Sequence, residues 1–198
     1  PGTYSLSAYS PEERFVRQHI FDRRPDVILN VVVASNLERN LYLTTELIDL
    51  SQPTVIALNM YDELEASGAT LNHEKLGGMI GIPMVPTVAR TGDGINTLLD
   101  TIIDVFEGRN RVERQVNINY GTTIEPELAI VSRLMQKSDD LPRQFPPRYW
   151  ALKLLEGDTE AQRTLRGWLQ QQRARSVAFG SEENFTNYNT PQDLEQPL

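Results

Sequence analysis

Asn59 and Asp62 stand three positions apart, directly after an apolar run of strand length at 53–58. Guanine presents N1–H and N2–H₂ as adjacent donors on one edge, and a carboxylate accepts both, whereas adenine offers no such pair. An Asn amide suits the O6/N7 side of the same base. The spacing therefore favours guanine selection. Asn and Asp also serve as turn residues and helix N-caps, so a purely structural role for the pair stays open.

A second polar segment with potential chemistry, Val88 to Gly94, follows the run 84–88 and precedes a helical pattern. A short loop containing Ala89 can offer its backbone N–H to a purine O6. The alternative interpretation is a glycine-rich connection in which Thr91 or Asp93 caps the next helix. Both interpretations place this segment at the end of a strand.

The elements that position these segments are predicted by hydrophobic periodicity. Residues 27–33 are nearly continuous and β-branched, which predicts a strand buried on both faces. Strand alternation with helices implies a parallel sheet, whose ligands bind at the carboxyl ends of the strands. The loops after Val33, Leu58 and Val88 are therefore expected at one edge. Further strands are predicted at 53–58 and 84–88, and helices at 37–50, 63–65, 73–80 and 95–106.

The chain changes character after Gly108. We expect an α/β domain over 1–108, a polar connecting segment over 109–123, and a helical domain with a polar tail over 124–198. Prolines interrupt the helical pattern of the last part. Its predicted helices begin near Ile124, near Tyr149 and near Asp158, the last carrying Leu165, Trp168 and Leu169.

Bulk composition narrows the classes of protein. The 198 residues carry a formal charge of −8, which argues against a nucleic-acid-binding surface. Cysteine is absent, so disulfides and Cys-based metal sites are excluded. His19 and His73 lie far apart, and we assign them no metal role. No stretch is long and apolar enough for a bilayer span. The chain opens on Pro1 without an initiator Met, which is typical of a piece of a longer or processed chain.

Taken together, segments spread over residues 1 to 158 resemble the cytoplasmic G domain of the ferrous iron transport protein FeoB, joined to its helical domain. Pro1 to Leu6 resembles the end of that family's D-x-P-G-x-Y-S-L segment, and Ala57 to Asp62 resembles its N-x-x-D base motif. The other similar segments are residues 36–43, 86–94 and 152–158. The resemblance implies an α/β fold: a P-loop GTPase-type parallel sheet, incomplete here, flanked by helices and followed by a small all-α domain.

The resemblance also assigns roles to residues of this sequence. Asn59 and Asp62 would bind guanine, with Met60 between them. Ala89 would contact the base oxygen through its N–H, and Val88 and Arg90 would line that loop. Gly2 would face the γ-phosphate, and residues 3–14 would belong to the second switch. Two positions depart from the pattern, since Val88 replaces a common Ser and Val33 an expected acidic residue.

The segment that would hold phosphates is not found. No G-x-x-x-x-G-K-[ST] segment occurs in the 198 residues. The resemblance places that segment, the first switch and the Mg²⁺ ligands before Pro1. No catalytic residue is therefore assigned in this chain. We expect a polypeptide of these residues alone to bind GDP poorly and to hydrolyse no GTP, because phosphate and Mg²⁺ contacts supply most nucleotide affinity.

The resemblance implies a regulatory GTPase domain of a ferrous iron transporter, at the cytoplasmic face of the bacterial inner membrane. Its partners would be GTP or GDP and the permease part of the same polypeptide, with self-association left open and no nucleic acid. Two alternatives remain at this stage. One is a GTPase of the ribosome-assembly type, and the other is a non-catalytic interaction module with a decayed nucleotide site.

Overall fold

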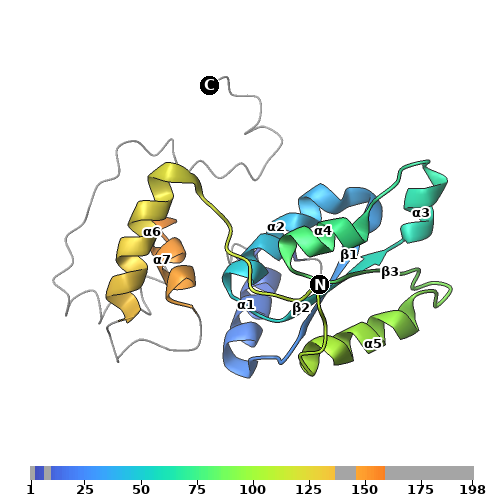
Figure 1. The fold of residues 1–198 in the computed structure, drawn as a ribbon, viewed down its shortest axis with the longest axis horizontal. Helices are drawn as coiled ribbons and strands as arrows, with labels where there is room; N and C mark the ends of the chain where they lie inside the picture. The colour runs from blue at the N-terminus through green and yellow to red at the C-terminus, as the bar shows by residue number, and fades with distance from the viewer. Residues whose placement is uncertain (1–2, 7–9, 137–145, 159–198) are drawn as a thin grey trace, which may run out of the picture.

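The structure is a computed structural model, and it describes residues 3–6, 10–136 and 146–158. Three parallel strands form a sheet in the order β1-β2-β3, with β2 in the centre (Figure 1). They are β1 (Ile28–Val33), β2 (Thr54–Asn59) and β3 (Met84–Pro86). The predicted parallel sheet flanked by helices is confirmed.

The two long strands differ in burial. Every residue of β2 before Asn59 is buried, as a central parallel strand requires. On β1, however, Leu29 is 41% and Val31 59% exposed. The prediction that 27–33 is buried on both faces was therefore wrong. The reason is helix coverage, because α2 contacts β1 from one side whereas the helix on the other side, α5, packs on β2 and β3.

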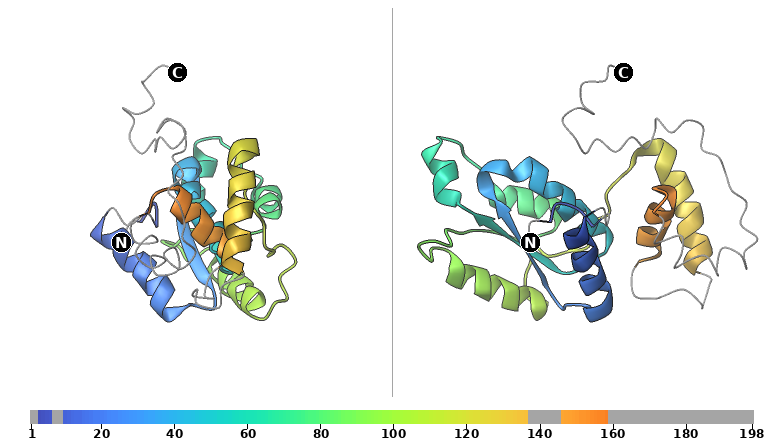
Figure 2. Two further views of the ribbon diagram at one scale, coloured as in Figure 1. Left: turned by 90° about the vertical axis from the view of Figure 1, so that its left-hand side faces the viewer. Right: turned by 180° about the vertical axis from the view of Figure 1, so that it is seen from behind.

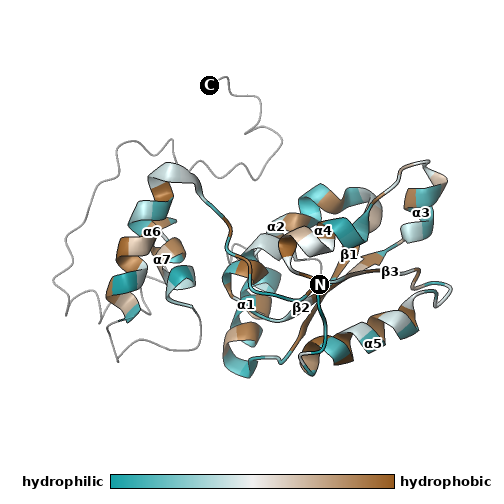
Figure 3. Cartoon of the chain, in the orientation of Figure 1, coloured by the Kyte–Doolittle hydropathy of each residue, from teal (hydrophilic) through white to brown (hydrophobic). Residues whose placement is uncertain are grey.

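Helices cover the two faces unequally (Figure 2). The helix α2 (Leu37–Asp49) and α4 (His73–Ile80) lie on one face, and α5 (Ile95–Phe106) lies on the other. The apolar strands run between the more polar outer surfaces of these helices (Figure 3). Short helical segments, η1 (Ala34–Asn36) and α3 (Tyr61–Ala66), follow β1 and β2. The bounds of α2, α4 and α5 are close to those predicted from the sequence.

One helix, α1 (Pro11–Arg23), was not predicted. Its apolar residues have weak helical periodicity, so the usual signal is faint. A capping box marks its start: the Ser10 side chain accepts from Glu13 N–H, and the Glu13 side chain accepts from Ser10 N–H. Ser10, Pro11 and Glu13 in that order were the readable signature.

The helices α6 (Gly121–Gln136) and α7 (Pro147–Leu155) lie side by side at one end of the molecule (Figure 1). Their apolar residues do not form a separate core but pack with α1 and α2. The shared cluster contains Leu6, Ile20, Leu47, Leu50, Leu128, Met135, Tyr149, Trp150, Ala151 and Leu152. The helix predicted from Asp158 and the polar tail lie outside the described residues. Over the described ranges, no helix has the length and apolarity of a bilayer span.

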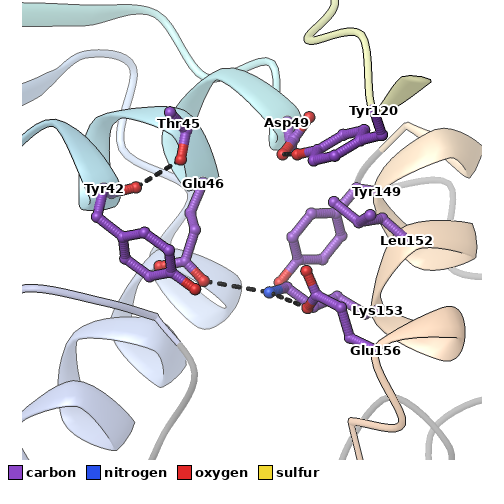
Figure 4. A pocket seen from close by; sticks show the side chains of 9 residues that line it. All are labelled: Tyr42, Thr45, Glu46, Asp49, Tyr120, Tyr149, Leu152, Lys153 and Glu156. Carbon is purple, nitrogen blue, oxygen red and sulfur yellow. Dashed lines mark hydrogen bonds and ion pairs between the residues drawn. The ribbon is translucent and has the colours of Figure 1, made fainter. Parts of the chain in front are cut away.

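A buried polar network joins α2 to α7 (Figure 4). Lys153 is 2% exposed, and its Nζ lies 3.1 Å from Glu46 Oε1 and 2.8 Å from Glu156 Oε2. The other Glu46 oxygen, Oε2, accepts the Leu6 N–H at 2.5 Å. Burial alone would lower the pKa of Lys153, but the neighbouring carboxylates of Glu46 and Glu156 raise it. The ammonium is thus charged, and its charge is compensated.

Further polar contacts lie beside this network. Arg17, 1% exposed, pairs with Asp158 at 2.7 Å and also donates to Leu6 O at 3.4 Å. Tyr120 donates its hydroxyl to the Asp49 carboxylate, and burial raises the pKa of Asp49 to about 6. Both backbone groups of Leu6 are therefore held by charged side chains, each of which pairs with a residue of α7 or of the turn that follows it.

We predict that Lys153→Met lowers the free energy of unfolding by about 3–5 kcal/mol, because Glu46 is left with an uncompensated buried charge. The matched control is Lys75→Met on the exposed surface of α4, where a change within about 0.5 kcal/mol is expected. Glu46→Gln combined with Lys153→Met should recover part of the loss. Urea unfolding measures all three. Equal effects of the two single Lys substitutions would contradict this role.

Candidate functional site

The loops after β2 and β3 meet at the end of the sheet away from α6 and α7 (Figure 1). The parallel register places Leu58 opposite Pro86. Pairing continues past the strands, because Thr87 N–H donates to Leu58 O at 2.9 Å and Tyr61 N–H donates to Thr87 O at 3.3 Å. The two loops are therefore joined at their base by backbone hydrogen bonds, as neighbouring carboxyl ends of a parallel sheet should be.

The turn between Asn59 and Asp62 depends on one unusual backbone conformation. Met60 has φ 57° and ψ 37°, in the left-handed region that residues with a Cβ rarely adopt. This lets the chain leave β2 and begin α3 at Tyr61 within a single residue. Met60, with no side-chain cap bond, is the N-cap residue of α3, and Asp62 lies in its first turn. The alternative in which Asp62 is the N-cap is therefore not what the structure shows.

Two side-chain contacts bridge the loops above that base. Ala89 N–H donates to Asn59 Oδ1 at 3.0 Å, and Arg90 Nη2 donates to Asp62 Oδ2 at 3.3 Å. The first contact defines the orientation of the Asn59 amide, because the atom that accepts must be the oxygen. The Asn59 NH₂ group then remains as a donor. The structure thus brings together four of the predicted residues, which are separated by about 30 positions in the chain.

The β3 loop is shaped by its own hydrogen bonds. Val88 forms an antiparallel bridge with Asp93, and Thr91 Oγ1 lies 2.6 Å from Asp93 Oδ2. These contacts occupy Thr91 and Asp93 within the loop, while Gly94 is the N-cap residue of α5 without a side-chain cap. Gly94 has φ +76°, and a Cβ there would lie 2.1 Å from Pro86 O. Only glycine fits this crossing under the end of β3.

The remaining predicted positions are less central. Val88 offers no hydroxyl and takes part in the loop through its backbone. Val33 ends β1 in register with Asn59 and is partly buried. Gly2 lies outside the described residues. Of the stretch 3–14, the structure places the part from Pro11 onward in α1.

This arrangement has a defined chemical capacity. Asp62 supplies carboxylate oxygens at the rim, where its side chain is 42% exposed. Asn59 supplies an amide donor nearby. A planar group with two adjacent N–H donors on one edge and acceptors on another is complementary to such a rim. The signal for the contact between Arg90 and Asp62 was not visible in the sequence, because residue spacing does not tell which loop side chains meet.

Comparisons with known proteins cover most of the chain. The sequence model of the family "Ferrous iron transport protein B" matches residues 1–102, and that of the "FeoB cytosolic helical domain" matches residues 120–190. The chain is 53% identical, over 164 residues, to an Fe(2+) transport protein A/Fe(2+) transporter FeoB fusion protein of Porphyromonas gingivalis. It is 35% identical, over 162 residues, to the Fe(2+) transporter FeoB of Escherichia coli K12.

These matches cover 82% and 80% of this chain but only 19% and 20% of the two relatives, so the chain spans about a fifth of their length. Solved structures agree in fold. The cytosolic domain of T. maritima FeoB in its GMPPNP form is similar, with a TM-score of 0.76, 28% identity, and coverage of 95% of this chain and 70% of that one. An S. thermophilus NFeoB mutant bound to GMPPNP is similar with a TM-score of 0.74 and 33% identity. The match covers 86% of this chain and 67% of that one.

We predict that Gly94→Ala destabilises the protein by at least about 2 kcal/mol, because the new Cβ would overlap Pro86 O and push the β3 loop away from the β2 loop. Gly92→Ala is the matched control. Gly92 also has a left-handed φ, +86°, but nothing lies within 4 Å of its added Cβ. Only backbone strain of about 1 kcal/mol is expected there. Urea unfolding compares the two, and equal losses would show that the close approach is unimportant.

Proposed function

The chain belongs to the FeoB family of ferrous iron transport proteins, and on that premise we propose that its β2 and β3 loops read the guanine base of GTP and GDP. The observation that carries the proposal is the bridged pair of loops, with Asn59 and Asp62 on one side and Ala89 and Arg90 on the other. The FeoB structures with GMPPNP and GDP support it as nucleotide-bound relatives.

Each residue has a role that follows from its chemistry. Asp62 accepts the N1–H and N2–H₂ of guanine, and its carboxylate rejects adenine, whose N1 is an acceptor and whose C2 carries no amino group. Asn59 presents its NH₂ group to the O6/N7 side. Ala89 N–H, which donates to Asn59 Oδ1, is shared between that oxygen and the base O6. Met60 and Val88 set the backbone of their loops and read no base atom through their side chains.

The proposal for these residues covers the base alone. The sequence contains no G-x-x-x-x-G-K-[ST] segment for phosphates, so we assign phosphate and Mg²⁺ binding, Gly2 apart, to residues outside these 198. GTP hydrolysis is then a property of the intact protein. A polypeptide of these residues alone would bind GDP poorly and would not hydrolyse GTP.

We assign the whole protein to ferrous iron uptake controlled by nucleotide, at the cytoplasmic face of the bacterial inner membrane. In this proposal residues 1–108 form the nucleotide domain, 109–123 the connection and 124–198 the helical domain beside the permease part. The shared core and the pairs made by Lys153 and Asp158 support direct communication between the first and last parts. Neither a ribosome-assembly GTPase nor an interaction module is favoured by the comparisons.

We predict that Asp62→Asn in the intact protein shifts preference from guanine to xanthine nucleotides. An Asn amide accepts N1–H and donates its NH₂ to the C2 oxygen of xanthine, which replaces the N2–H₂ of guanine. GDP affinity should fall about tenfold to a hundredfold while XDP affinity rises, the range expected for one bidentate base contact. Calorimetric titration with both nucleotides measures the shift.

The control for that experiment is Asp100→Asn on α5, which makes the same chemical change at an exposed position. It should leave both affinities unchanged. If Asp62→Asn also leaves the preference for GDP over XDP unchanged, Asp62 does not read the base and the proposal fails.

A further inference from the structure

We propose that Arg90 is a positioning residue, which sets the Asp62 carboxylate in the orientation that guanine requires. This rests on the proposed function and adds a specificity-determining residue to it. Arg90 comes from the β3 loop and Asp62 from the first turn of α3, 28 positions away. Within the described ranges, the one side chain that forms an ion pair with Asp62 is that of Arg90.

The contact is the outermost of four that join the loops. From the sheet outward they are Thr87 N–H to Leu58 O, Tyr61 N–H to Thr87 O, Ala89 N–H to Asn59 Oδ1, and Arg90 Nη2 to Asp62 Oδ2. The inner two use backbone groups and the outer two use side chains. The Asp62 carboxylate is therefore tied to the β3 loop through a side chain, that of Arg90.

The backbone that carries Arg90 is itself held. Val88 N–H donates to Asp93 O at 3.0 Å, and both Thr91 N–H and Gly92 N–H donate to Val88 O. The turn from Val88 to Asp93 is thus closed around Ala89 and Arg90. A guanidinium on a fixed turn loses less freedom on pairing than one on an open loop, and its planar donors match a carboxylate.

The number of lone pairs on the Asp62 carboxylate decides whether Arg90 can orient this group while the base is bound, or must compete with the base for it. An ionised carboxylate has about four acceptor sites, of which guanine uses two. The Arg90 contact uses one site, on Oδ2, so base and guanidinium can be bound together. If Arg90 instead blocked the carboxylate, a nucleotide would have to break the pair, and removing Arg90 would strengthen binding.

Exposure explains why the effect should show in binding rather than in folding. The side chains of Arg90 and Asp62 are 80% and 42% exposed, so the pair adds little to stability in water. A base over Asp62 removes water from that carboxylate, which strengthens its interaction with the neighbouring cation. Substitution of Arg90 is therefore compatible with folding and acts on the ligand.

The test compares GDP with IDP, whose hypoxanthine base lacks the N2–H₂ group. The dissociation constant of IDP divided by that of GDP, both measured by calorimetry on the full-length protein, reports how well Asp62 accepts both donors. Arg90→Ala should lower this ratio about twofold to fivefold, the upper part of the range for exposed ion pairs. Arg90→Lys should give an intermediate ratio, because an ammonium pairs without the planar fork.

The matched control is Arg109→Ala, which removes the exposed pair of Arg109 with Asp104, 2.8 Å apart, at the end of α5. It should leave the ratio at the wild-type value. The inference is overturned if Arg90→Ala behaves like Arg109→Ala, or if Arg90→Ala binds GDP more tightly than wild type. Wild-type protein that does not prefer GDP to ADP would instead overturn the proposed function and this inference with it.

Discussion

The parallel pairing of β2 with β3 is the constraint on which the candidate site depends. Because Leu58 lies opposite Pro86, the residues that follow the two strands leave the sheet side by side. Backbone hydrogen bonds at Thr87 and Tyr61 continue the pairing beyond the strands. The left-handed Met60 and the Cβ-free Gly94 then let each chain turn sharply into its helix. In this way the loops after β2 and β3, which lie far apart in the sequence, form one rim at the end of the sheet.

The opposite end of the molecule is organised by buried charge. Glu46 on α2 and Lys153 on α7 neutralise each other, and Arg17 pairs with Asp158. Both pairs converge on the backbone of Leu6. Because α2 contacts β1 next to the central strand and also packs in the same core as α7, it connects the sheet with the helical part. The position of residues near Leu6 is therefore linked to the docking of α7.

Local sequence patterns predict the elements whose structure depends on nearby residues. The buried run before Asn59 and the amphipathic repeat from Ile95 to Phe106 predicted β2 and α5 close to their bounds. Parallel topology then correctly placed the loops after Leu58 and Val88 together. The helices in the segments near Ile124 and Tyr149 were also predicted from their periodicity.

Other features depend on contacts that no local pattern encodes. A β-branched run looks the same whether or not a helix covers it, so the exposure of Leu29 and Val31 was missed. α1 lacks a strong apolar stripe, since Arg17 is among its few buried residues. The pairing of Arg90 with Asp62 joins two loops whose side chains meet only in the folded chain. Such contacts follow from tertiary packing, which overrides spacing along the sequence.

A crystal structure of the intact protein with GDP shows directly whether Asp62 reads guanine. We expect N1 and N2 of the base to lie about 2.7–3.2 Å from the two Asp62 carboxylate oxygens, the normal range for such hydrogen bonds. A base bound elsewhere, or bound between the loops with Asp62 turned away from its N1–N2 edge, would contradict it.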